Sequence, residues 1–309
     1  MTTAAIILIV IMFSVYGLLT SIECGVCWTM LFPKLTNNPR SNNIYTPIWE
    51  ITNVFLVFGM TAMAMFFNGG LVKIIDKNAY LLFIAGLGLL VRAVTGLYIF
   101  YVRKNPAKLS KFILLCASYL TPICIGCVGI YLFTGHKFSA THLGQTLLLS
   151  IFFGLTLIGI AFANRFKLKI VNKVKYTLYA LYLVWAILLG YFLPKTAQSL
   201  NVNLVRLPLA LIALIIATST IVYFGFAAMK DKVHELYQFV MAVAFIVPVI
   251  LAVDLRPYLI FNNITLAKAY GASAYQYSII VGTIICTPLL LFAGYLIFKL
   301  LIDAEKSKK

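Results

Sequence analysis

Nine long apolar segments run through this chain of 309 residues and limit the folds open to it. Each is close to or above about 20 residues, the length that an α-helix needs to cross the hydrocarbon core of a bilayer. They lie near residues 4–32, 47–67, 79–101, 112–134, 146–165, 176–194, 207–229, 236–255 and 276–300. Because their apolar residues run continuously, without the alternation of membrane β-strands, helices are favoured over a barrel. The sequence predicts an all-α polytopic membrane protein: a bundle of nine transmembrane helices in a single domain, residues 1–309.

The composition supports this class. Hydrophobic residues make up 62% of the chain, and charged residues only 11%. Soluble domains are closer to a quarter charged, and a soluble chain of this size could not bury so much apolar surface. No stretch of the sequence has the composition of a separate soluble domain or of a low-complexity linker.

The positions of Lys and Arg predict the orientation of the helices. With nine spans, the loops after odd-numbered spans and the C-terminal tail share one side of the membrane, and they hold 17 of the 25 Lys and Arg residues. The other side holds 7, and Arg92 lies within a span. By the positive-inside rule, the N-terminus is expected outside and the C-terminus in the cytoplasm, in a multi-pass protein of the cytoplasmic membrane. The net charge of +17 then reflects topology, and nucleic-acid binding is not needed to explain it.

Three charged residues lie well inside the predicted spans, away from their ends: Glu23, Glu50 and Arg92. A charge in this setting costs roughly 2.5–3.5 kcal/mol on insertion scales, so each needs a structural or functional reason. Glu23 and Arg92 both lie about 14 Å from the cytoplasmic ends of their helices, whereas Glu50 is only about 5 Å from the start of its own. Equal depth makes Glu23 and Arg92 candidates for an ion pair. The two carboxylates fit a proton relay from the cytoplasm, and a static pair that only fixes helix packing fits as well.

Two C-x-x-C runs, Cys24–Cys27 and Cys124–Cys127, could indicate a zinc or redox site. Their predicted depths in the membrane differ, which does not suit a single tetrahedral site. Buried apolar thiols are the better interpretation.

Haem ligation by this chain is not expected. The three histidines, His136, His142 and His234, all fall in predicted loops. Met60 and its neighbours Met63 and Met65 offer thioethers in the second span, but methionine in an apolar helix usually packs.

Short runs in the first and last thirds of the chain carry a family resemblance. Ile22-Glu23-Cys24-Gly25-Val26 ends a long first helix, Pro47-Ile48-Trp49-Glu50-Ile51-Thr52-Asn53 opens the second span, and Arg92 lies in the third. Ala228-Met229-Lys230-Asp231-Lys232, Asn262-Asn263-Ile264-Thr265-Leu266 and Thr287-Pro288-Leu289 follow in order, while 104–206 carries no such match. Together these runs resemble subunit II of the cytochrome bd quinol oxidases. Glu50 stands where that family has Asp, and Thr20 where it has a second carboxylate.

The resemblance implies a non-haem subunit of an oxidase complex that uses quinol electrons to reduce dioxygen to water. Haems b and d would belong to a haem-bearing partner, subunit I, which also contacts the quinol pool. This chain would supply no catalytic residue and ligate no metal, and a structural quinone or lipid remains open. We expect Glu50 to be the entry carboxylate and Glu23 a deeper relay member, with Arg92 balancing Glu23 and with Trp49 and Asn53 orienting the cluster.

Two other functions would also account for the charged residues inside the spans. A proton-coupled secondary transporter would bind its substrate or coupling proton at them. A purely structural scaffold subunit would need them only for packing with its partner.

Overall fold

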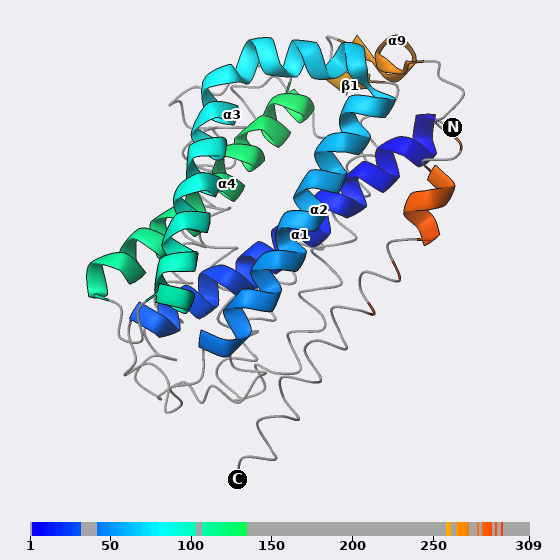
Figure 1. Ribbon diagram of the computed structural model, residues 1–309. Helices are drawn as coiled ribbons and strands as arrows, with labels where there is room; N and C mark the ends of the chain where they lie inside the picture. The colour runs from blue at the N-terminus through cyan, green and yellow to red at the C-terminus, as the bar shows by residue number, and fades with distance from the viewer. Residues whose placement is uncertain are drawn as a thin grey trace, which may run out of the picture.

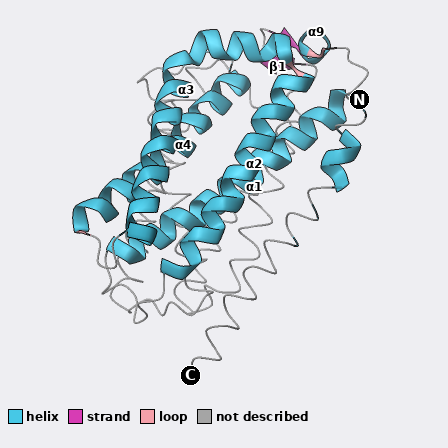
Figure 2. Cartoon of the chain, viewed as in Figure 1, coloured by secondary structure: helices cyan, strands magenta, loops and turns pink. Residues whose placement is uncertain are grey.

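Four long helices form most of the part of the chain that the structure describes (Figures 1 and 2). The computed structural model describes residues 2–31, 42–102, 107–134, 258–260 and 264–271, with a few further positions between 277 and 292. The helices are α1 (Thr2–Leu31), α2 (Asn42–Phe66), α3 (Asn68–Leu97) and α4 (Lys108–Thr134), and α3 runs on into a π-helical turn at Tyr98–Val102. All four are long and apolar enough to cross a membrane. The described part of the chain is therefore that of a helical multi-pass membrane protein.

The first four spans expected from the sequence, near 4–32, 47–67, 79–101 and 112–134, overlap these four helices. The five expected from residue 146 onward lie almost wholly outside the described residues. The clearest difference is in α3, which begins at Asn68 and not near 79.

A kink at Asn78 explains the early start of α3. This residue has φ −126° and ψ 22°, which interrupts the helix, and its Nδ2 donates to the carbonyl of Ile74 at 3.1 Å. The segment before the kink lies across the end of the bundle, and the segment after it runs along the other helices (Figure 1). The sequence places the span where the second segment begins, because Lys73, Asp76 and Lys77 make the first segment too polar to resemble a span.

Helix α1 is the central helix of the described bundle. It packs against both α2 and α4, and α4 packs in turn against α3. Within the chain, 61% of the most apolar window of α1 is buried, compared with 28% for α3. A helix that is apolar on all sides is expected in such a central place. Helix α3 is left with a broad apolar face that the described residues do not cover.

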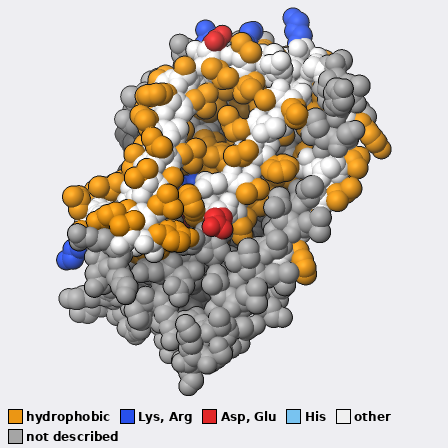
Figure 3. Space-filling view, in the orientation of Figure 1, with side chains coloured by type: hydrophobic (Ala, Val, Ile, Leu, Met, Phe, Trp, Pro, Cys, Tyr) orange, Lys and Arg blue, Asp and Glu red, His pale blue; other side chains and the backbone are white. Residues whose placement is uncertain are grey.

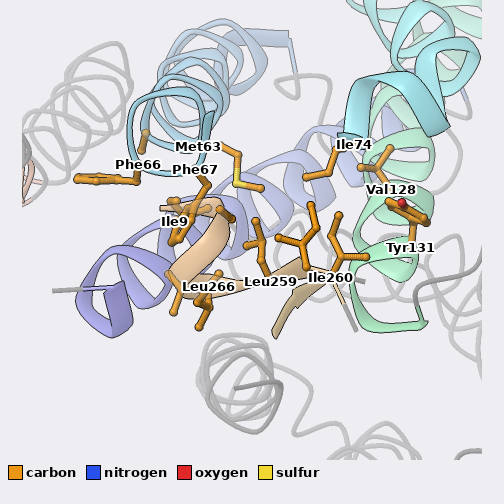
Figure 4. Packing of buried hydrophobic residues seen from close by; sticks show 14 of the residues in the cluster. Ile9, Met63, Phe66, Phe67, Ile74, Val128, Tyr131, Leu259, Ile260 and Leu266 are labelled. Carbon is orange, nitrogen blue, oxygen red and sulfur yellow. The ribbon is translucent and has the colours of Figure 1, made fainter. Parts of the chain in front are cut away.

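A short hairpin closes one end of the bundle, which we call the hairpin end. Strand β1 (Tyr258–Ile260) pairs antiparallel with β2 (Ile264–Thr265), and the one-turn helix α9 (Leu266–Ala269) follows directly. Figure 4 shows side chains of this segment packed among those of α1, α2, α3 and α4. Leu259 and Ile260 are fully buried there. This segment falls between the spans that the sequence predicts near 236–255 and 276–300. It is ordered because its apolar side chains complete the core of the helices.

The join between α2 and α3 is held by this segment. A single non-helical residue, Phe67, separates the two helices, and its ring meets that of Tyr270 edge to face at 5.9 Å between centroids. The backbone N–H of Gly271 donates to the carbonyl of Phe66 at 3.1 Å. Gly70 has no side chain because a Cβ there would overlap Leu259. Close backbone approach is what requires glycine at this position.

Glycine also sets the spacing of α3 and α4. A Cβ on Gly88 would lie 2.8 Å from Thr121 Oγ1 and 3.4 Å from Leu120 Cβ. The Thr121 hydroxyl cannot easily move away, because it donates to the carbonyl of Ala85 on α3 at 3.2 Å. The two helices are thus in contact at Gly88 and tied together by a hydrogen bond one turn earlier.

We predict that Gly88→Ala destabilises the protein relative to the matched variant Gly86→Ala. A Cβ on Gly86 meets nothing within 4 Å, so this substitution should only gain the higher helix propensity of alanine. At Gly88 the overlap should cost about 1–3 kcal/mol, as overpacking does elsewhere. The measurement is the thermal unfolding midpoint of the purified protein in detergent. Equal midpoints for the two variants would contradict the close packing of α3 and α4.

Candidate functional site

A buried ion pair joins α1 to α3. Arg92 Nη1 donates to Glu23 Oε2 at 2.9 Å, and both side chains are 0% exposed. The second guanidinium nitrogen, Nη2, donates to Asn53 Oδ1 on α2. One arginine therefore connects three helices, because its planar fork presents several donors in fixed directions. The ion pair expected from equal depth in the membrane is present.

The energetics of this pair depend on its hydrogen bonds. Removing two charges from water costs several kcal/mol for each ion, and their attraction offsets that cost only with good geometry and further partners. Asn53 supplies such a partner to Arg92. Loss of either charge would leave the other buried without compensation, so we expect both to be needed for the fold.

The second oxygen of Glu23 is in a different situation. Among the described residues, Oε1 is buried and has no hydrogen-bond partner. The Thr52 side chain lies beside this carboxylate, but its hydroxyl donates to the carbonyl of Ile48 at 2.7 Å. Glu23 thus keeps one oxygen able to accept a hydrogen bond or a proton.

Glu50 lies apart from the buried pair. Its side chain is exposed. Because α2 begins at Asn42 and not near 47, Glu50 lies about 12 Å from the start of the helix and not about 5 Å. It comes three residues before Asn53. That spacing corresponds to about 4.5 Å along the helix axis. Asn53 thus lies one turn of α2 from the exposed carboxylate and contacts the buried pair itself.

The neighbouring Trp49 is half-buried and packs against an apolar cluster that includes Ile22 and Ile48. Asn53 contacts the buried pair directly, and the orienting roles expected of Trp49 and Asn53 stay predictions.

Two buried tyrosines, Tyr16 and Tyr119, were not singled out from the sequence, and Thr20 was noted only as a departure from the family. On α1, Tyr16 and Thr20 lie two turns and one turn before Glu23 and are 2% and 0% exposed. On α4, the hydroxyl of Tyr119 accepts a hydrogen bond from Trp28 Nε1 at 2.8 Å. The spacing of Tyr16, Thr20 and Glu23 by four and three residues could have indicated a shared polar face. Nothing in the sequence indicated which helix this face would meet.

The two C-x-x-C runs lie in different places. Cys24 and Cys27 are buried against α4, with Cys24 Sγ 3.7 Å from the carbonyl of Ser118 and Cys27 Sγ 3.7 Å from Ser118 Oγ. Cys124 and Cys127 belong to the apolar cluster at the hairpin end. None of these four cysteines forms a disulfide in the described part of the chain. They are separate pairs of buried thiols, as their mismatched depths predicted.

The described residues offer no metal centre: they contain no group of three or more His, Cys, Asp or Glu side chains able to hold an ion. His136, His142 and His234 lie outside the described residues. Met63 is buried in the apolar core, and Met60 and Met65 are exposed on α2. The thioether of Met63 therefore packs against other apolar side chains.

A wide apolar surface extends over α2 and α3 on the face seen in Figure 3. Its exposed members include Val57, Phe58, Met60 and Met65 on α2 and Phe83, Leu87, Leu90, Val91, Val94 and Leu97 on α3. We call these residues the α2–α3 face. A surface of this kind is stable against lipid tails or against another apolar protein, and not against water.

We predict that Arg92→Leu strongly destabilises the protein and that adding Glu23→Gln restores part of the loss. The single variant leaves a buried carboxylate without its counter-charge, which should cost about 3–5 kcal/mol. The double variant removes that charge as well. Thermal unfolding midpoints of the single and double variants give the answer. A double variant that unfolds at a lower temperature than Arg92→Leu would contradict the pairing.

Comparison with known proteins places the chain in a family. A sequence model of the cytochrome bd terminal oxidase subunit II matches residues 1–301. The fold is also similar to that of a chain in the structure of bd oxidase from Geobacillus thermodenitrificans, with a TM-score of 0.80 at 18% sequence identity over 97% of this chain and 98% of that one. No curated protein matches the sequence. Since the family match covers nearly the whole chain, this protein belongs to the cytochrome bd terminal oxidase subunit II family.

Proposed function

We propose that this chain is the non-haem subunit of a bd-type terminal oxidase, which stabilises a haem-bearing partner and delivers protons to it from the cytoplasm. Membership of the subunit II family supports an oxidase complex. The observation that carries proton delivery is the arrangement of two carboxylates: Glu50 exposed in the first half of α2, and Glu23 buried with one oxygen open. Reduction of dioxygen to water takes up protons, so a route from one side of the membrane is chemically required.

The orientation belongs to this proposal. Nine spans with the N-terminus outside and the C-terminus in the cytoplasm follow from the Lys and Arg distribution. In this orientation the hairpin end faces outside, and the start of α2, with Glu50, faces the cytoplasm. Protons would reach Glu50 from cytoplasmic water and pass inward, in the direction of Asn53 and Glu23.

Glu50, Glu23 and Asn53 have different roles in this proposal, because their surroundings differ. Glu50, whose side chain is exposed, exchanges protons with water. Glu23, held by Arg92, is fixed in position while its Oε1 stays open. Asn53 keeps the Arg92 side chain in place, so that the counter-charge does not follow the moving proton. Haems b and d of the partner would carry out the reduction of dioxygen.

The partner is proposed to bind the α2–α3 face. Glu50 is exposed on the described part of this chain, near the α2 side of that face. A carboxylate facing lipid at this depth would be costly, whereas one enclosed between two protein subunits and open to cytoplasmic water would not. A haem-bearing subunit bound to the α2–α3 face would also lie close to the carboxylates that deliver protons to it.

A purely structural role is the alternative that the geometry also allows. The complete burial of Glu23 and its contact with Arg92 are what a static packing pair would show. Turnover measurements separate the two roles, because a static pair does not make the rate depend on proton transfer.

We predict that Glu50→Gln in the assembled complex lowers oxygen consumption by about 10-fold or more and raises its deuterium isotope effect, since general acid–base groups contribute about 10²–10⁴-fold. The matched control is Asp76→Asn, which removes an exposed carboxylate from the first segment of α3, at the opposite end of the bundle. Oxygen uptake in H₂O and D₂O is the measurement. Unchanged turnover and isotope effect in Glu50→Gln would leave only the structural role.

We also predict that a photo-crosslinking amino acid at Val57 forms an adduct with the haem-bearing subunit. Val57 lies two turns along α2 from Glu50, and its side chain is 62% exposed. The same probe at Leu109, exposed on the first turn of α4, controls for random capture. Adducts are identified by gel shift and mass spectrometry. If position 57 captured only lipid, the α2–α3 face would not be the docking face.

A further inference from the structure

Buried polar side chains continue along α1 beyond Glu23, toward the hairpin end. Tyr16, Thr20 and Glu23 are spaced by four and three residues, which places them on one face of the helix. All three are buried, with exposures of 2%, 0% and 0%. Tyr16 lies about 10 Å from Glu23 along the helix axis. It is close to the middle of α1, and the proton route proposed above does not use it.

The hydroxyl of Tyr16 lacks a hydrogen-bond partner among the described residues. Thr20 lies beside it but donates its own proton to the backbone carbonyl of Tyr16 at 2.8 Å. A buried hydroxyl without a partner costs free energy, so such groups in native proteins usually bind an ordered water. Tyr16 therefore has an O–H donor to offer, and Thr20 Oγ1 still has room to accept.

Glu23, in turn, has a carboxylate oxygen that can accept a hydrogen bond. Its Oε2 is occupied by Arg92, and its Oε1 has no partner among the described residues. Tyr16 and Glu23 lie on the same buried face of α1, on either side of Thr20. An acceptor oxygen and a donor hydroxyl, both buried and both on one face of α1, are what a bridging water requires.

We propose that a bound water lies between Tyr16 Oη and Glu23 Oε1, and that Tyr16 is a positioning residue for Glu23. The water donates one hydrogen bond to Glu23 Oε1, accepts one from the Tyr16 hydroxyl, and can donate its second proton to Thr20 Oγ1. This gives it the two to four polar partners that a buried water needs. The water site follows from the buried groups alone, whereas its effect on turnover rests on the proposed proton delivery by Glu23.

High-resolution cryo-electron microscopy of the purified complex tests the water site. We expect a density peak within hydrogen-bond distance of both Tyr16 Oη and Glu23 Oε1, and its loss in Tyr16→Phe. The control is Tyr131→Phe, which removes the hydroxyl of another buried tyrosine, on α4. The peak should remain there. No peak in the natural protein, or an unchanged peak in Tyr16→Phe, would overturn the inference.

Turnover in H₂O and D₂O tests the positioning role. We expect Tyr16→Phe to lower oxygen consumption by roughly fivefold, the size expected for one lost hydrogen bond, and to change the isotope effect. A residue that only packs would lower the stability and leave the isotope effect alone. If Glu50→Gln alters the isotope effect and Tyr16→Phe does not, proton delivery stands and the role of Tyr16 is wrong. If the water peak is present but neither variant alters the isotope effect, the proposed proton delivery fails and the water site stands.

Discussion

The guanidinium of Arg92 is the group on which the described bundle most depends. It meets Glu23 on α1 and Asn53 on α2 from its own place on α3, in a part of the protein that is closed to solvent. In a bilayer, helices gain little from moving apolar surface away from lipid, since lipid tails are as apolar as leucine. Polar contacts and close packing must therefore fix how the helices sit. The ion pair supplies the polar contacts, and the contact at Gly88 supplies the close packing.

This arrangement leaves the two carboxylates in opposite surroundings. Glu23 is fixed by a counter-charge and screened from water, while Glu50 is exposed one helical turn from Asn53. A proton route needs both kinds of group: one that exchanges with water and one that holds its position where water is scarce. The unfilled hydrogen-bond capacity of Glu23 Oε1 and of the Tyr16 hydroxyl extends this polar region toward the middle of α1. The α2–α3 face beside it is apolar and uncovered by the described residues, which suits contact with lipid tails or with another membrane subunit.

The sequence predicted the features that follow from hydropathy and charge. The membrane class follows from long apolar runs, and the ion pair follows from two opposite charges at equal depth on two spans. The kink at Asn78 and the hairpin at 258–265 did not, because each depends on tertiary contacts. Asn78 directly follows Asp76 and Lys77, so the sequence there resembles a loop before a span, and Leu259 orders its segment only because Gly70 leaves room for it. The burial of Tyr16 was missed for the same reason: a tyrosine in a span fits an interfacial or a core position equally well until its neighbours are known.

Assembly with a haem-bearing subunit is the claim on which the proposed function rests. Purification of the tagged chain from native membranes in mild detergent, followed by the reduced-minus-oxidised visible spectrum, tests it most directly. The account predicts that bands of haem b and haem d accompany the chain in a fixed proportion through every step. A chain that purified folded and intact, with no haem bound to it or to any partner, would contradict the account.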